Sequence, residues 1–342
     1  MIQAKQELKS VFARIGGALL IFLGLFNILL TPATVLKETL VGYFPSSAGV
    51  YIFTDLLNSL AYVATFIFPV FFFYMISKNK KTEEMNLSLR FPKERPVLFT
   101  LSVVLLGISV CTACSYVNSF LAPIPEAIYD SLFEQSFDNG YELVLMFLST
   151  AIVPAFVEEF LFRGMILSNI RPYSESGAIF ISAILFGLMH QTPFQLFYAT
   201  AVGIVLGFVF VKTGSIWCGV LLHFFNNFLS VFQTYLLYAL DVQTANIVFG
   251  IMNCALICAG ILLSGIFYLI SRPKKEKAVF EEIGVFGKVE LNGDVRKTKL
   301  SNTDIVKALC TPTMIIFVVL CVVTIISTSV LMYLTSILYS LV

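Results

Sequence analysis

Repeated runs of about twenty apolar residues constrain this chain more than any other feature, because a helix of that length crosses the hydrocarbon core of a bilayer. Hydrophobic residues make up 58% of the 342 residues, charged residues make up 13%, and the mean hydropathy is +0.89. One soluble core has no room for so much apolar surface. The sequence therefore predicts an all-α fold, a polytopic helical membrane protein.

The apolar runs predict about eight to nine transmembrane helices in a single integral-membrane domain, residues 1–342. We place nine spans near residues 13–31, 56–77, 97–121, 141–168, 176–190, 194–211, 215–238, 245–270 and 313–341. The first run lacks a small-residue cleavage site, so we expect a retained helix rather than a removed signal peptide.

The distribution of basic residues predicts the orientation of the chain. If the N-terminus is cytoplasmic, 21 of the 22 lysine and arginine residues, Arg163 included, fall inside and Lys37 falls outside. Cytoplasmic loops of membrane proteins carry such an excess of positive charge. We therefore expect a multi-pass protein of the cell membrane, of bacterial type because its loops are short, with residues 271–312 as a cytoplasmic loop.

Titratable residues at membrane depth are costly, so they usually mark a functional site. The fourth span carries two adjacent glutamates, Glu158 and Glu159, followed by Arg163. Positions four apart share a helix face, whereas adjacent positions point about 100° apart. We predict that Glu159 pairs with Arg163 while Glu158 faces elsewhere, which leaves Glu158 free for acid–base chemistry.

The chain has two histidines, and the first, His190, ends the fifth span. Glu158 lies sixteen residues before Ser174, in the connecting turn, and His190 lies sixteen residues after it. Antiparallel neighbouring helices would therefore hold Glu158 and His190 at equal depth. Phe186 lies one turn before His190, so its ring would share that face and wall the site.

The seventh span supplies His223 and Asn227, which lie four residues apart on one helix face. The helical rise brings Asn227 close to the depth of Glu158. Imidazole and amide N–H groups in a dry site could bind a developing oxyanion. Alternatively, Glu158, His190 and His223 could hold a divalent metal, a ligand set that suits zinc.

Two further features of this region predict local geometry. Pro154, just before the glutamates, removes a backbone hydrogen bond, so the carbonyl that it frees needs another partner or water. Gly203 and Gly207 form a small-x-x-x-small face on the sixth span, which predicts a close contact between helices.

In combination these residues resemble the signature of the CPBP family, the intramembrane CAAX proteases and bacteriocin-processing proteins. The three motifs that carry the likeness are Glu158-Glu159-x-x-x-Arg163, Phe186-x-x-x-His190 and His223-x-x-x-Asn227. Their order and spacing match on all three. The resemblance covers roughly residues 141–230, which it marks as the catalytic core.

The resemblance implies an all-helical membrane peptidase that cleaves near the cytoplasmic side of the bilayer. It implies that Glu158, assisted by His190, activates the attacking water, while His223 and Asn227 stabilise the tetrahedral oxyanion. The implied catalytic set is Glu158, Glu159, His190, His223 and Asn227, with Arg163 and Phe186 as structural support.

A metal remains an open alternative at this point. Family members are often labelled metalloproteases, yet a metal-free, glutamate-dependent mechanism is also proposed for some of them. Zinc would take Glu158, His190 and His223 with water in the fourth position, but the H-E-x-x-H helix of zincins is absent from the sequence. We expect no other cofactor.

The resemblance also implies the partners. We expect a membrane-embedded or lipid-anchored peptide as substrate and the lipid bilayer as the surroundings, with no nucleic acid. A non-catalytic membrane scaffold or bacteriocin self-immunity protein is the second hypothesis, although every motif residue is intact. A carrier or channel ranks third, because the polar residues gather in one pocket and no inverted repeat is evident.

Overall fold

The computed structural model describes residues 2–44, 47–77, 97–121, 140–270 and 300–340. Within these ranges every regular element is a helix, and no strand forms. The N-terminal helices are α1 (Ile2–Leu25), the π-helical η1 (Phe26–Leu30), α2 (Thr31–Tyr43), α3 (Ala48–Ser77) and α4 (Val97–Leu121).

The remaining helices belong to the centre and the C-terminal part of the chain. They are α6 (Gly140–Phe147), η2 (Leu148–Ile152), α7 (Val153–Glu159), η3 (Phe160–Leu167), α8 (Ser168–Ile170), α9 (Glu175–Met189), α10 (Pro193–Thr213), α11 (Ile216–Ala239), α12 (Val242–Ile270), α14 (Asn302–Leu309) and α15 (Pro312–Ser340). The predicted polytopic all-α architecture is confirmed.

Eight helical segments of the described chain, rather than nine, are long and apolar enough to cross a membrane. The difference lies in the predicted span 176–190, which forms the 15-residue helix α9. At 1.5 Å per residue this helix is about 22 Å long, short of the ~30 Å hydrocarbon core. The first segment is longer than predicted, because η1 joins α1 and α2 into one run, Ile2–Tyr43.

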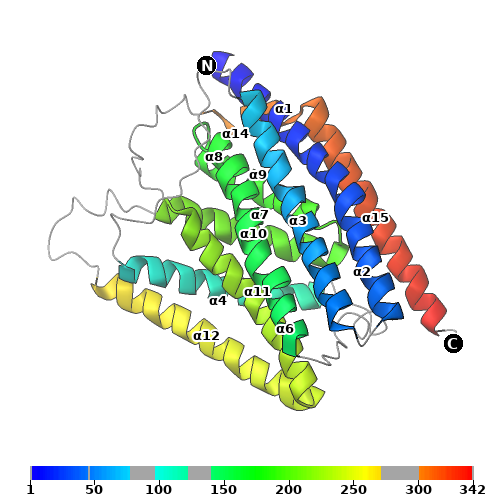
Figure 1. The fold of residues 1–342 in the computed structure, drawn as a ribbon. Coiled ribbons are helices and arrows are strands. Elements are labelled where there is room, and N and C mark those ends of the chain that lie inside the picture. Colours follow the sequence, from blue (N-terminus) through cyan, green and yellow to red (C-terminus); the bar gives the residue numbers. More distant parts are fainter. Residues whose placement is uncertain (1, 45–46, 78–96, 122–139, 271–299, 341–342) are drawn as a thin grey trace.

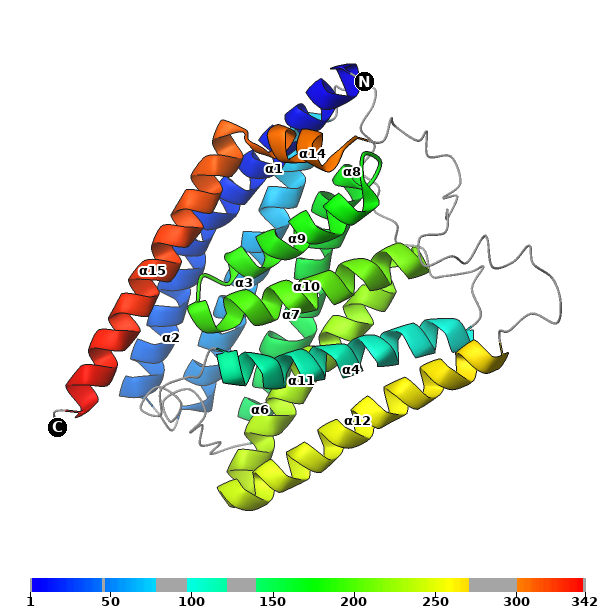
Figure 2. The same ribbon diagram turned by 180° about the vertical axis from the view of Figure 1, so that it is seen from behind.

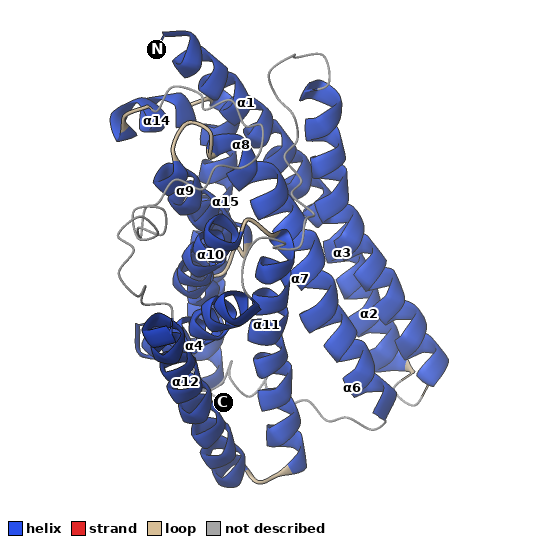
Figure 3. Cartoon of the chain, turned by 90° about the vertical axis from the view of Figure 1, so that its left-hand side faces the viewer, coloured by secondary structure: helices blue, strands red, loops and turns tan. Residues whose placement is uncertain are grey.

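The helices pack in several sets. On one side α1 packs against α3 and α15, and on the other α4 packs along α12, as Figure 1 shows. Helices α7 and α11 lie between these two sides (Figure 3). Helices α9 and α10 pack side by side as an antiparallel hairpin (Figure 2). The fully buried phenylalanines of the core come from the α1, α3, η3 and α15 segments and include Phe12, Phe66, Phe162 and Phe317.

The turn between α9 and α10 decides where His190 lies. Helix α9 stops because the backbone of Gln191 adopts a left-handed conformation, with φ 55°, which residues other than glycine rarely take. Thr192 then caps α10, accepting a hydrogen bond from Gln195 N at 3.4 Å, and Pro193 occupies the first turn. His190 is thereby held at the end of a short helix inside the bundle.

The predicted disturbance at Pro154 is present. The segment before it, η2, is π-helical, and Pro154 stands at the start of α7. In a regular α-helix the carbonyl of Thr150 would accept from residue 154, which is a proline without an N–H. Asn227 Nδ2 donates to Thr150 O at 3.1 Å instead. The freed carbonyl thus finds its partner on α11, and α7 is tied to that helix.

The predicted cytoplasmic loop 271–312 contains a helix. Residues 302–309 form α14, capped by Ser301, and Lys5 on α1 pairs with Asp304 at 2.7 Å. The remaining part of that predicted loop, residues 271–299, lies outside the described residues.

Candidate active site

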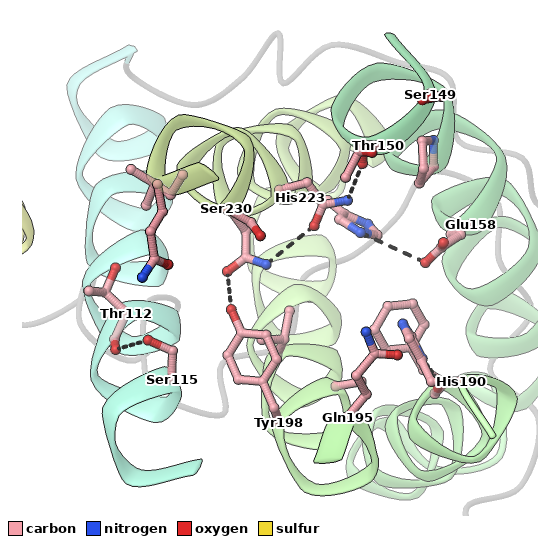
Figure 4. Close-up of a pocket in the computed structure, with 18 of the residues that line it drawn as sticks. Thr112, Ser115, Ser149, Thr150, Glu158, His190, Gln195, Tyr198, His223 and Ser230 are labelled. Atoms are coloured by element: carbon pink, nitrogen blue, oxygen red, sulfur yellow. Dashed lines mark hydrogen bonds and ion pairs between the residues drawn. The ribbon is translucent and has the colours of Figure 1, made fainter. Parts of the chain in front are cut away.

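One cavity of about 470 Å³ opens between α3, α4, α7, α10, α11 and α12. Its walls include Glu158, His190, His223 and Asn227, four of the five residues of the predicted catalytic set, together with Phe186. Figure 4 shows Glu158, His190 and His223 around one end of this cavity. Residues from α7, from the end of α9 and from α11 thus line one cavity.

Glu159, the fifth residue of the set, lies behind the cavity wall. Its Oε1 accepts from Arg163 Nη1 at 2.8 Å, and both side chains are fully buried. Arg163 Nη2 also donates to Gly203 O at 3.1 Å, which ties α10 to the pair. The predicted Glu159–Arg163 pair is confirmed. Arg163, which was counted from the sequence with the cytoplasmic basic residues, is fully buried beside this carboxylate.

Glu159 has a second partner that the sequence did not indicate. His223 Nδ1 lies 3.0 Å from the same oxygen, Glu159 Oε1. This approach depends on Gly219, one turn before His223, because a Cβ at that position would lie 2.8 Å from Glu159 Oε2. One buried carboxylate therefore orients both Arg163 and the imidazole of His223.

Glu158 faces the cavity, as predicted, and has a different environment. Its Oε1 accepts a hydrogen bond from the phenol of Tyr62 on α3. Its Oε2 is 3.8 Å from His223 Nε2 and has no hydrogen-bond partner among the described residues. That separation is too long for a direct hydrogen bond. It suits a small polar group that forms hydrogen bonds to both atoms.

His190 is oriented by the backbone. Its Nδ1 lies 2.8 Å from Phe186 O, and because a carbonyl can only accept, Nδ1 carries the hydrogen. Nε2 is therefore the ring nitrogen left for a substrate or water. The Phe186 ring packs edge-on against both imidazoles, with centroids 5.0 Å from His190 and 5.8 Å from His223. The guanidinium of Arg163 lies 4.9 Å from the same ring, so Phe186 walls the site as predicted.

Asn227 is tied to two neighbours. Besides donating to Thr150 O, it accepts from Asn226 Nδ2 at 3.4 Å through Oδ1. An amide nitrogen carries two hydrogens, so one N–H of Asn227 remains for a group in the cavity.

Sequence reasoning missed several residues of the cavity wall. Tyr62 is one, since it lies in a phenylalanine-rich apolar run with no motif around it. Others are further polar residues of the wall: Thr112, Ser115, Gln195, Tyr198, Asn226, Ser230, Gln233 and Asn253. The sequence did contain a signal for these residues, namely amide and hydroxyl side chains inside apolar spans. Such polar residues need partners when they are buried, so they indicate a polar cavity.

A metal site is the alternative that the sequence left open. Among the described residues, no group of three or more His, Cys, Asp or Glu side chains is arranged to hold a metal ion. Glu158 and His223 face each other, but no third ligand from the described part of the chain joins them in a metal-binding arrangement. The predicted zinc ligands Glu158, His190 and His223 therefore do not fit a metal in this arrangement.

Comparison with known proteins identifies the segment that carries this site. Residues 140–229 match the family model described as type II CAAX prenyl endopeptidase Rce1-like. Searches of curated proteins and of solved structures give no match. The matched residues agree closely with the 141–230 core suggested by the three motifs. The chain therefore carries, at residues 140–229, a segment that matches the Rce1-like type II CAAX prenyl endopeptidase family and supports the resemblance to the CPBP/CAAX proteases.

Proposed function

We propose that this protein is an intramembrane endopeptidase that hydrolyses a peptide bond of a membrane-embedded or lipid-anchored substrate. The observation that supports this most directly is the buried Oε2 of Glu158, which faces a cavity and lies 3.8 Å from His223 Nε2. A carboxylate anchored through one oxygen by Tyr62, with the other oxygen available, is the arrangement that a general base requires.

The first step is attack by water. A water molecule between Glu158 Oε2 and the imidazoles gives one proton to Glu158, and His190 Nε2, with its hydrogen on Nδ1, accepts the other hydrogen bond of that water. The water oxygen then forms a bond to the carbonyl carbon of the substrate, and the carbonyl oxygen becomes an oxyanion. The buried site strengthens every hydrogen bond to this charge.

The oxyanion receives hydrogen bonds from α11. Asn227 supplies the amide N–H that Thr150 does not use. His223 keeps Nδ1 against Glu159 Oε1 and directs Nε2 into the cavity, where an N–H on this atom would reach the oxyanion. Glu158 then returns its proton to the amide nitrogen of the leaving peptide, the C–N bond breaks as the oxyanion re-forms the C=O bond, and the products are a carboxylic acid and an amine.

The sequence and the fold together support a proposal for the membrane location and orientation of the chain. We propose a multi-pass bacterial cell-membrane protein whose N-terminus is cytoplasmic, with residues 141–230 as the catalytic core of one integral-membrane domain. The turn Arg171–Ser174 lies at the N-terminal end of the bundle, where the basic residues Lys5 and Arg171 also gather.

Cleavage of a membrane-peptide library tests the proposal. Purified protein in lipid vesicles is incubated with quenched fluorescent peptides, some lipid-anchored, and the products are identified by mass spectrometry. We expect new amino and carboxyl termini from the wild-type protein and none from Glu158→Gln. A wild-type protein that cleaves no peptide would favour the scaffold or self-immunity hypothesis, and cleavage abolished by a chelator would favour the metalloprotease.

A further inference from the structure

The cavity continues away from Glu158 into a region that the proposed mechanism does not use. We call it the polar arm, and it is formed by Thr112, Ser115, Asn226, Ser230, Gln233 and Asn253. Figure 4 shows Thr112 and Ser115 on α4 across the cavity from Glu158, with Tyr198 between the two sides. Amides and hydroxyls from α4, α11 and α12 therefore face one another inside a membrane-embedded bundle.

Two atoms of the polar arm have hydrogen-bonding capacity that the described protein does not use. Asn253 is 2% exposed and donates to Tyr116 Oη at 3.0 Å, but its Oδ1 has no partner in the described part of the chain. Thr112 is 5% exposed, and its Oγ1 likewise has none. Leaving a buried polar group without a partner is costly, and most costly within a membrane. Both atoms can accept a hydrogen bond, so they suit a ligand that donates N–H groups.

The charge of the cavity wall restricts that ligand further. Among the described residues that line the cavity there is no lysine or arginine, and the acidic and imidazole groups, Glu158, His190 and His223, lie at the other end. The nearby cation Arg163 is fully buried and bound to Glu159 and Gly203 O. A carboxylate in the polar arm would lose its water without gaining a cation. A prenyl chain would leave the amides and hydroxyls unpaired.

Resting on the proposed function, we infer that the polar arm binds an uncharged, extended segment of the substrate peptide through its main-chain N–H groups, with no requirement for a free C-terminal carboxylate. The acceptors are Asn253 Oδ1 and Thr112 Oγ1. The cavity volume of about 470 Å³ falls within the range of roughly 300–1,000 Å³ typical of ligand sites. The substrate is therefore recognised beside the scissile bond by its backbone and by its lack of charge.

Binding and cleavage are measured separately. The probe for binding is a fluorescent, lipid-anchored peptide composed of Ala, Ser, Thr and Gln. Its sequence is one that the protein cleaves in the library, or a fixed sequence of this composition if no library peptide is cleaved. It is compared with versions that carry a C-terminal amide, two Asp substitutions, or one N-methylated amide in the neutral segment. Fluorescence anisotropy gives Kd on Glu158→Gln protein in nanodiscs, with and without Thr112→Val and Asn253→Leu.

The matched control is Thr100→Val. Thr100 lies on the same helix, α4, and its hydroxyl also has no partner in the described residues, but it does not line the cavity. We expect Thr100→Val to bind like the parent, whereas Thr112→Val and Asn253→Leu each weaken binding about fivefold, the effect of one hydrogen bond. N-methylation of the peptide should weaken its binding to the parent protein by about the same factor. It should weaken binding to the Asn253→Leu variant much less.

Charge supplies the second set of outcomes. We expect the free-acid and amidated peptides to bind within about twofold of each other, and two Asp residues to weaken binding at least about tenfold. Equal binding by the polar-arm variants and the parent, or a free acid bound tenfold more tightly than the amide, would overturn the inference. Cleavage assays on protein with Glu158 intact separate the two proposals. If the protein cleaves peptides and the polar-arm variants cleave equally fast, only this inference is overturned. If binding depends on the polar arm but no peptide is cleaved, only the proposed function is overturned.

Discussion

His223 Nδ1 lies 3.0 Å from Glu159 Oε1, the oxygen that also accepts from Arg163 Nη1 at 2.8 Å. Glu159 is fully buried, so it contacts no substrate, yet it fixes which ring nitrogen of His223 faces the cavity. The adjacent Glu158 is anchored by a different helix. Two neighbouring carboxylates thereby receive different tasks from their surroundings.

Glu159→Gln should destabilise the protein, because Arg163 would remain buried without its counter-charge. We expect the free energy of unfolding to fall by about 3 kcal/mol, the usual effect of breaking a buried ion pair. Unfolding of the purified protein in mixed detergent measures this change. The double variant Glu159→Gln/Arg163→Met removes both charges and should recover part of the loss. A single variant as stable as wild type would show that the pair does not brace the helix.

Tyr62→Phe should lower kcat about tenfold, because the phenol that holds Glu158 Oε1 is lost while the ring still packs on Phe66. KM and the unfolding midpoint should change little, as expected for a positioning residue. Tyr74→Phe is the matched control, on the same helix with an exposed side chain. Equal kcat values for the two variants would argue against a role for Tyr62.

Gly219→Ala should disturb the site by displacing Glu159, which lies behind the cavity wall. The new Cβ would lie 2.8 Å from Glu159 Oε2, so Glu159 must shift and His223 with it. We expect about 1–3 kcal/mol of destabilisation and at least a tenfold loss of kcat, which thermal unfolding and peptide cleavage measure. Gly250→Ala, in open space on α12, should be neutral or slightly stabilising. An active Gly219→Ala enzyme would contradict the close approach.

Chelation should leave peptide cleavage unchanged. Glu158 and His223 face each other, but no third ligand from the described residues joins them in a metal-binding arrangement. Cleavage rates are compared after dialysis against a zinc chelator and after zinc is added back. Loss of activity that zinc restores would revive the predicted ligand set of Glu158, His190 and His223.

The helical positions of the site residues could be predicted from spacing. The Glu159–Arg163 pair and the shared face of Phe186 and His190 follow from residues four apart on a helix, and both are present. The freed carbonyl near Pro154 was equally predictable. These relationships are local, so one helix and its geometry are enough to derive them.

The contacts between distant helices could not be predicted in this way. Tyr62 reaches Glu158 across 96 residues, and Asn227 reaches Thr150 across 77. Neither pairing leaves a periodic pattern, because each depends on how the helices cross. The bounds of α9 were predicted to within one residue, 176–190 against Glu175–Met189, but its assignment as a full membrane span was wrong because 15 residues are too few to cross.

The rate of peptide cleavage by Glu158→Gln, relative to wild type, tests the central role of Glu158 most directly. The substitution is nearly isosteric and removes only the ionisable carboxylate, while Glu175→Gln makes the same change at a half-exposed position on α9. With all three proteins shown to be folded in vesicles, we expect Glu158→Gln to cleave about 100- to 10,000-fold more slowly, the usual contribution of a general base. Glu175→Gln should retain the wild-type rate. A Glu158→Gln protein that cleaves as fast as wild type would contradict glutamate-activated hydrolysis.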